Sequence, residues 1–313
     1  MGSYFAKRVL SSLITLLIIS FISFVFVALL PGSPAEVLLG EFATPEAAAI
    51  LTHEWGLDQP ILYRYAIWMG NVLHGNFGES LISRIPVRSL VARAWPVSVE
   101  LCLLSLLIAL VAGLPLGVVT ATAKPRSERV VMTSVLVAQS VPSFVSGILM
   151  ILVLSVKLHW LPSSGYVSFL ENPVQNLKVM IMPSLSLGLV IAALLTRFTR
   201  SCMLDALGAD FVRTARAKGL RELTVLIRHA FRSAMIPVVS LIGAQLVWFL
   251  GGAIIQEIVF VLPGLGRAVV RAVMGRDFAL IQAVVLLIAT VAAIANLFVD
   301  VVYGLLDPRI RYD

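Results

Sequence analysis

The sequence has 313 residues, of which 59% are hydrophobic and 13% are charged. A soluble domain of this size carries about twice that share of charged side chains, so the composition excludes an ordinary soluble protein and predicts an integral membrane protein. The formal net charge is +7, but its distribution along the chain fits membrane topology and gives no reason to expect a nucleic-acid partner.

The first apolar run covers residues 9–30 and follows Lys7 and Arg8. It is long enough to cross a bilayer. Its apolar core is longer than that of a signal peptide and no convincing cleavage site follows it, so we interpret it as a first transmembrane helix with its N-terminus in the cytoplasm.

Residues 31–96 are rich in proline and acidic side chains, which predicts an extracytoplasmic insert. Thr44 and Pro45 indicate the start of a short helix within it. The aromatic side chains of the insert either form an interfacial belt or contact an external protein; they are Trp55, Tyr63, Tyr65 and Trp68.

Five further apolar segments predict transmembrane helices, at residues 97–123, 130–156, 179–198, 234–262 and 280–306. Gly113 and Gly117 form a small-residue face that permits close helix approach in lipid. Pro142, halfway along the third helix, predicts a kink. The distribution of lysine and arginine places both termini inside. The predicted fold is therefore an all-α membrane protein of six helices, forming a single domain over residues 1–313.

Residues 201–233 are basic and lie between the fourth and fifth predicted helices. Their spacing predicts two short amphipathic helices, with Leu204, Leu207, Phe211 and Ala215 on one stripe and Leu223, Leu226, Ile227 and Ala230 on the next. A break is expected at Gly219, because glycine adopts a left-handed turn without a Cβ penalty. Small residues around this turn would let another protein approach closely, inside a basic rim. Composition alone also fits a cytoplasmic loop enriched in positive charge.

Several chemistries have no sequence support. The phosphate-binding pattern G-x-x-x-x-G-K-[ST] does not occur, so we expect no ATP hydrolysis by this chain. The histidines stand alone and the two cysteines indicate neither a disulfide framework nor a thiol site, so no cofactor or metal is expected on this chain. Polar residues inside the predicted helices are candidates for the wall of a translocation path; they are Gln139, Ser140, Pro142, Ser143, Gln245 and Glu257.

The basic segment contains ARAKGL followed by RHAFRSAMIPV, which resembles the cytoplasmic coupling loop, or EAA loop, of binding-protein-dependent ABC permeases. More narrowly, the sequence resembles the B-type permease of the peptide and nickel importers. Arg213 and Thr214 stand where the general pattern has Glu and Ala, and Arg232 stands where it has Pro; the peptide-permease variant shares this departure. HWLPSSGY, PGLG and LDPR further along the chain are also similar to that family.

The resemblance implies a permease subunit of an importer in a bacterial or archaeal cytoplasmic membrane. It implies a second related permease, two ATPase subunits that bind ATP and magnesium, and an external substrate-binding protein that the aromatic insert would contact. The loop residues expected to contact the ATPase are Arg213, Ala215, Arg216, Ala217, Lys218, Gly219, Leu220 and His229.

The solute stays open at this point, because relatives of this type carry dipeptides, oligopeptides, glutathione, opines, nickel chelates or sugars. The alternative function is a carrier or channel driven by an ion gradient without an ATPase. Such a protein would be expected to have paired charges inside the membrane and inverted repeats, whereas only Asp300 lies well inside a predicted helix.

Overall fold

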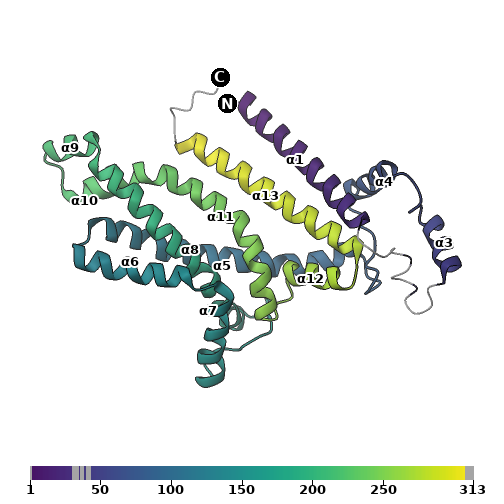
Figure 1. The fold of residues 1–313 in the computed structure, drawn as a ribbon. Coiled ribbons are helices and arrows are strands. Elements are labelled where there is room, and N and C mark those ends of the chain that lie inside the picture. The colour runs from purple at the N-terminus through teal and green to yellow at the C-terminus, as the bar shows by residue number, and fades with distance from the viewer. Residues whose placement is uncertain (1, 30–34, 36–38, 40–43, 307–313) are drawn as a thin grey trace. The chain divides into compact units, whose positions relative to one another are not determined.

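The computed structural model describes residues 2–29, 35, 39 and 44–306, and Figure 1 shows their helices. Apart from one isolated antiparallel bridge between Glu79 and Pro86, this part of the chain contains no strand pairing. Five of its helices are long and apolar enough to cross a membrane, and a bent helix pair would add a sixth. The protein is therefore an all-α membrane protein. The six-helix layout and the single domain stay predictions, as does the start of the insert, which lies largely outside the described residues.

The chain forms two compact units, and each is described by itself. One unit contains residues 1–97 and 263–294, and the other contains residues 98–262 and 295–313. The helices of the first unit are α1 (Gly2–Ala28), α3 (Pro45–Glu54), α4 (Ile61–Leu73), the first turns of α5 (Val87–Thr122), α12 (Leu265–Met274) and most of α13 (Phe278–Leu306).

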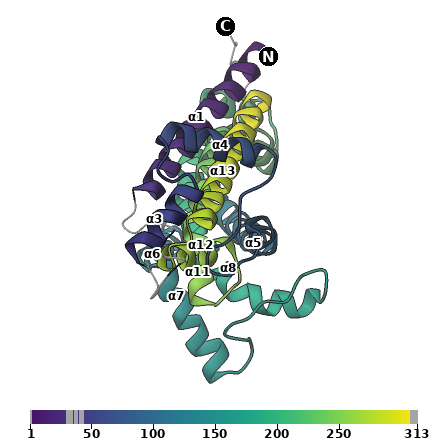
Figure 2. The same ribbon diagram turned by 90° about the vertical axis from the view of Figure 1, so that its right-hand side faces the viewer.

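In the first unit, the insert is anchored at two points. Figure 2 shows α4 beside α1, and there the hydroxyl groups of Tyr65 and Ser20 lie 2.7 Å apart while the Phe24 and Tyr65 rings meet edge to face. At the other point, the buried carboxylate of Asp277 accepts a hydrogen bond from the Ser80 hydroxyl and one from the N–H of Leu81. Asp277 therefore ties the start of α13 to the segment that precedes α5.

The second unit is built around α8 (Pro173–Gly208), whose buried residues run from Asn176 to Ala206. Its other elements are the remainder of α5, α6 (Pro125–Ser140), α7 (Ser143–Met150), the π-helical η2 (Ile151–Lys157), α9 (Asp210–Ala217), α10 (Glu222–Thr224), the π-helical η3 (Val225–Phe231), α11 (Arg232–Val259) and the end of α13. α8 begins before the apolar run of residues 179–198, because the Asn172 side chain accepts the N–H of Gln175 at 3.1 Å and caps the helix.

Small residues bring α5 and α8 into close contact. A Cβ atom on Gly113 would lie 2.8 Å from the Cβ of Leu195, and one on Gly117 would lie 2.6 Å from the Cβ of Thr199. The hydroxyl of Thr196 donates across the same interface to the carbonyl of Gly113 at 3.3 Å. In lipid, such packing and interhelical hydrogen bonds hold helices together. The predicted close approach at this face is confirmed.

The predicted kink at Pro142 is a sharp break. α6 ends at Ser140 and α7 begins at Ser143, and the two helical pieces are bent by 94°. Val141 is extended, with φ of −87° and ψ of 121°, because the proline ring that follows disfavours the helical conformation. Proline also lacks the N–H that would continue the helical hydrogen bonds.

Candidate functional site

The segment between α8 and α11 forms a helical hairpin of residues 210–231, at the end of α8 in Figure 1. α9 and α10 are separated by a turn in which Gly219 has a φ of +74° and donates its N–H to the carbonyl of Arg216 at 2.9 Å. A Cβ on Gly219 would meet no atom within 4 Å. The predicted break at Gly219 is confirmed, and backbone conformation rather than lack of space requires the glycine.

One face of the hairpin is buried against the ends of α8 and α11. Val212, Val225 and Ala230 are fully buried in an apolar cluster with Met203, and Ala215 in the same cluster is 5% exposed. The methyl group of Ala215 is enclosed by its own chain, which does not support direct contact with a partner, and that contact stays a prediction. Each predicted stripe is half right. Two members of each lie in this cluster, namely Leu207, Ala215, Leu226 and Ala230, whereas the other two members of each are exposed, namely Leu204, Phe211, Leu223 and Ile227.

The opposite face of the hairpin is open, and every residue from Arg216 to Arg221 is exposed. Leu223 and Ile227 lie four positions apart and are 67% and 57% exposed. His229 is half-buried. Exposed apolar side chains next to positive charges are suited to binding another protein. We call this surface the hairpin face; its residues are Arg213, Ala217, Lys218, Gly219, Leu220, Leu223 and Ile227.

Two of the predicted contact arginines are paired within the chain. Arg216 donates from Nε to Oε2 of Glu222 at 3.1 Å and from Nη2 to Oε1 at 2.5 Å. This carboxylate raises the pKa of Arg216 because its hydrogen bonds favour the charged guanidinium. Arg213 pairs with Asp210 at 3.2 Å. Within the described residues Lys218 has no ion pair, so its charge remains for a partner.

Sequence reasoning missed Glu222. Its partner Arg216 lies six positions away across the turn, outside the spacing at which helical side chains normally meet. The sequence did contain a signal for this pair. Glu222 is an acidic residue that comes shortly after the turn at Gly219, and a basic helix precedes that turn.

Two arginines near the end of α8 connect it to α6. Arg200 forms an ion pair with Glu128, and Arg197 donates from Nη1 to the side-chain oxygen of Gln139 at 2.9 Å. Gln139 was predicted to line a translocation path, and the structure places it in this helix-to-helix contact. The hairpin therefore extends from a helix that is fixed to its neighbour by polar bonds.

The other predicted path residues are in three places. Ser140 and Pro142 are exposed and Ser143 is half-buried, at the break after α6. Gln245 is half-buried on α11, about 18 Å of helix away from Glu257. The path role of these four residues stays a prediction.

Glu257 is fully buried and accepts a hydrogen bond from the Ser98 hydroxyl at 2.5 Å. Close by, the buried hydroxyl of Ser186 donates to Gln256 at 3.0 Å. A buried carboxylate in a membrane helix is costly and needs such partners. In this conformation Glu257 belongs to a polar layer between α5, α8 and α11, so its burial does not support a place in an open path wall.

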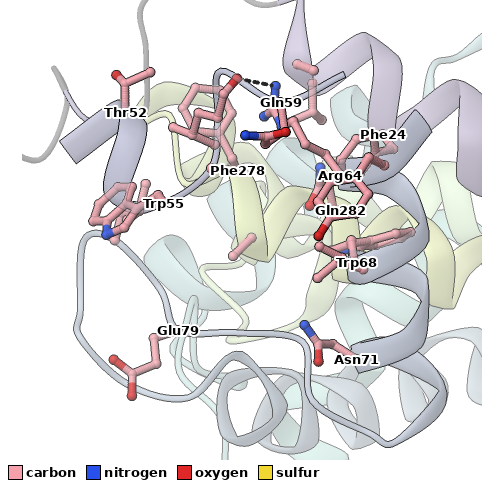
Figure 3. Close-up of a pocket in the computed structure, with 18 residues that line it drawn as sticks. Phe24, Thr52, Trp55, Gln59, Arg64, Trp68, Asn71, Glu79, Phe278 and Gln282 are labelled. Atoms are coloured by element: carbon pink, nitrogen blue, oxygen red, sulfur yellow. Dashed lines mark hydrogen bonds between the residues drawn. The ribbon is translucent and has the colours of Figure 1, made fainter. Parts of the chain in front are cut away.

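A cavity of about 620 Å³ lies in the first unit, lined by aromatic residues of the insert (Figure 3). Trp55 and Trp68 form part of its wall, and Arg64 donates to the carbonyl of Leu57 at 3.1 Å, the bond drawn in the figure. Burial lowers the pKa of the Arg64 guanidinium. Tyr65 does not line the cavity, and its hydroxyl group is hydrogen-bonded to Ser20 of α1. Contact of this insert with an external protein stays a prediction.

Within the described residues, no three histidine, cysteine or carboxylate side chains come together in a group that would hold a metal ion. The geometry therefore presents an exposed apolar and basic face, a broken helix and a buried polar layer.

Comparison with known proteins connects these features. Residues 113–312 match a family model described as a binding-protein-dependent transport system inner membrane component, and residues 1–102 match the N-terminal model of that component. A protein of Brucella abortus (strain 2308) whose name describes a peptide transport system permease is 38% identical over 314 residues, which cover 100% of both chains. The glutathione transport system permease protein GsiC of Escherichia coli (strain K12) is 40% identical over 313 residues, again 100% of both chains.

Among solved structures, the chain is similar to a chain of the MetNI methionine ABC transporter in an inward-facing conformation. The TM-score is 0.58 at 18% sequence identity, and the match covers 70% of this chain and 96% of that one. At this level of identity, the likeness concerns the fold alone.

Proposed function

The chain belongs to the family of binding-protein-dependent transport system inner membrane components, and we propose that it is the permease subunit of an ATP-driven importer for peptides or similar small solutes. The family and its relatives support a permease that works with an ATPase, and they do not support the alternative of a carrier driven by an ion gradient. The names of the relatives support peptides and glutathione as the solute class.

The observation that carries the proposal is the hairpin face. The helix pair buries one side against the membrane helices. On its other side it exposes an apolar surface made of Leu220, Leu223 and Ile227, and this surface is available for contact with a partner. Lys218 adds a charge that would favour an acidic partner surface. We propose that this face docks on an ATPase subunit, which binds ATP and magnesium.

The assembly that follows contains this chain, a second related permease, two ATPase subunits and an external substrate-binding protein, with both termini of this chain in the cytoplasm. Closure of the ATPase pair on ATP would displace the hairpin and shift the population between outward-open and inward-open bundles. The break at Pro142, with Ser140 and Ser143 beside it, is the proposed position of the path wall.

The experiment is affinity purification of the chain from its native membrane with its partners, followed by ATPase and uptake assays. We expect a second permease and an ATPase to co-purify. The Leu220→Asp variant should lose ATPase binding or ATPase-driven uptake, because a carboxylate would replace an exposed apolar contact.

The matched control is Leu170→Asp, at a leucine that is 94% exposed in the loop between η2 and α8. This variant should assemble and transport normally. A chain that purifies alone and transports in proteoliposomes without ATP would contradict the proposal.

A further inference from the structure

A second cavity of the first unit, of about 340 Å³, is distinct in character from the aromatic one. It lies between the start of α5, α12 and the start of α13, and its apolar wall includes Leu90, Ala94, Ala272 and Leu280. Neither the family match nor the proposed import mechanism gives this cavity a role.

Three arginines line this cavity. Arg267 and Arg271 are four positions apart on α12 and so lie on one side of that helix, and Arg93 comes from α5. Within the described residues, Arg93 and Arg271 have no ion pair. Arg93 and Arg271 are exposed and Arg267 is half-buried, so the first two guanidinium groups are accessible to a ligand from outside the chain.

The single carboxylate at the cavity offsets only part of this charge. Asp277 lines it, but its oxygens already accept hydrogen bonds from the Ser80 hydroxyl and from the N–H groups of Leu81 and Leu280. Asp277 is 1% exposed, and its bond to the N–H of Leu280 stabilises the first turn of α13. Arg93 and Arg271 alone carry two positive charges against the single negative charge of Asp277, so the cavity has an excess of positive charge that favours an anion from outside the chain.

The surroundings indicate which anion. α12 is amphipathic, and on its last turn Val273 and Met274 are 52% and 82% exposed. A short amphipathic helix with arginines on one side and exposed apolar residues on another is typical of a membrane surface. Guanidinium groups bind phosphate oxygens in pairs of parallel hydrogen bonds. An apolar wall below such a site fits the glycerol and acyl portion of a lipid.

We propose that this cavity binds the phosphodiester headgroup of an anionic phospholipid, held by Arg93 and Arg271 with Arg267 beside them. The single negative charge of the lipid phosphate offsets the excess positive charge of Arg93 and Arg271 over Asp277, and the lipid fixes α12 at the membrane surface. The site is separate from the hairpin face and does not depend on the importer function.

The test is native mass spectrometry of the full chain in detergent, titrated with phosphatidylglycerol or with phosphatidylcholine. The wild-type chain should retain phosphatidylglycerol in preference to phosphatidylcholine. The Arg93→Gln/Arg271→Gln double variant should bind phosphatidylglycerol at least about tenfold more weakly, since each lost charge-assisted hydrogen bond is worth about a factor of ten.

The matched control is Arg88→Gln, an exposed arginine earlier on α5 that does not line the cavity. It should bind phosphatidylglycerol like the wild type. A thermal unfolding curve for each variant separates a lost site from a lost fold, and Arg271→Lys, which keeps the charge, should fall between the wild type and the double variant.

Three outcomes would overturn the proposal. Equal binding of the two lipids by the wild type would show that the site does not select an anionic headgroup. Unchanged binding by a folded double variant would show that Arg93 and Arg271 do not hold the lipid. Full displacement of phosphatidylglycerol by inorganic phosphate at equal concentration would show a site for the free ion rather than for a lipid. None of these outcomes bears on ATP-driven import.

Discussion

Gly117 of α5 faces Thr199 of α8 so closely that a Cβ atom on residue 117 would stand 2.6 Å from the Cβ of Thr199 and 2.9 Å from the carbonyl oxygen of Thr196. Carbon atoms in proteins do not approach this closely, and one of the obstructing atoms belongs to the backbone. The two helices are therefore held at a separation that only glycine allows at this position.

The Gly117→Ala variant should accordingly be less stable, by about 1–3 kcal/mol, because the added methyl group would push α5 away from α8. Thermal unfolding in detergent measures the loss. Gly251→Ala is the control, since a Cβ there meets no atom within 4 Å; it should be neutral or slightly stabilising. Equal unfolding temperatures for the two variants would show that the α5–α8 contact is looser than described.

The stability lost by substitution at Gly219 should depend on how well the new residue tolerates the left-handed backbone conformation of this position. Asn tolerates a positive φ better than a β-branched residue, so Gly219→Asn should be mild and Gly219→Val should lose at least about 1–2 kcal/mol of local stability. Hydrogen exchange of the hairpin amides measures this. Gly208→Ala, at a glycine without positive φ and with open space around it, serves as the control. Identical effects of Asn and Val would refute the conformational explanation.

The Arg216 and Glu222 pair should hold the turn without adding to the stability of the whole chain, because both side chains are exposed and water screens them. Glu222→Gln should speed hydrogen exchange at residues 218–221 and leave the unfolding temperature unchanged. The exchanged pair Arg216→Glu/Glu222→Arg should recover part of the protection. Asp210→Asn, which breaks the neighbouring pair to Arg213, should leave the turn as it is; an equal effect would count against a specific role.

The hydroxyl group of Tyr166 should lose its proton at a higher pH than an ordinary tyrosine. Its hydroxyl donates to Oε2 of Glu100 at 2.8 Å, and burial together with this carboxylate raises the pKa of Tyr166 to about 12. An unfolded tyrosine has a pKa of about 10, so the contribution to stability is fully present below about pH 10 and is lost as the pH rises through about 12. Tyrosinate absorbance, compared between wild type and Tyr166→Phe, isolates the residue.

Glu100→Gln provides the second arm of that titration. Removing the negative charge should move the pKa of Tyr166 back towards the ordinary value. The difference in tyrosinate absorbance between the wild type and Tyr166→Phe reports on Tyr166 alone. If this difference titrates near pH 10, the bond to Glu100 is not formed in solution.

Hydropathy predicted the membrane helices because a chain in lipid must satisfy its backbone groups within helices, so apolar length alone identifies them. Glycine spacing predicted that the helix with Gly113 and Gly117 can approach another helix closely, without identifying α8 as the partner, and glycine chemistry predicted the turn at Gly219. These features depend on neighbours in the sequence, and local pattern is sufficient for them.

The sequence predicted only part of the buried side of the hairpin. Apolar residues surround α9 and the end of α8, and Phe211 and Val212 are adjacent, so periodicity does not distinguish their faces. Tertiary packing buried Val212 with Met203 and left Phe211 exposed. Nor could local pattern join Glu257 to Ser98, whose positions differ by 159 residues.

The length of α8 has a mechanical consequence. Its 36 residues form one helix of about 54 Å, and a single residue, Ala209, separates it from α9. The neighbouring pair α6 and α7 is instead divided at Pro142 by a bend of 94°. A force applied at the hairpin would therefore act on one continuous helix, with Pro183 as its internal proline, beside a helix pair that is already broken, and bending is expected first at that break.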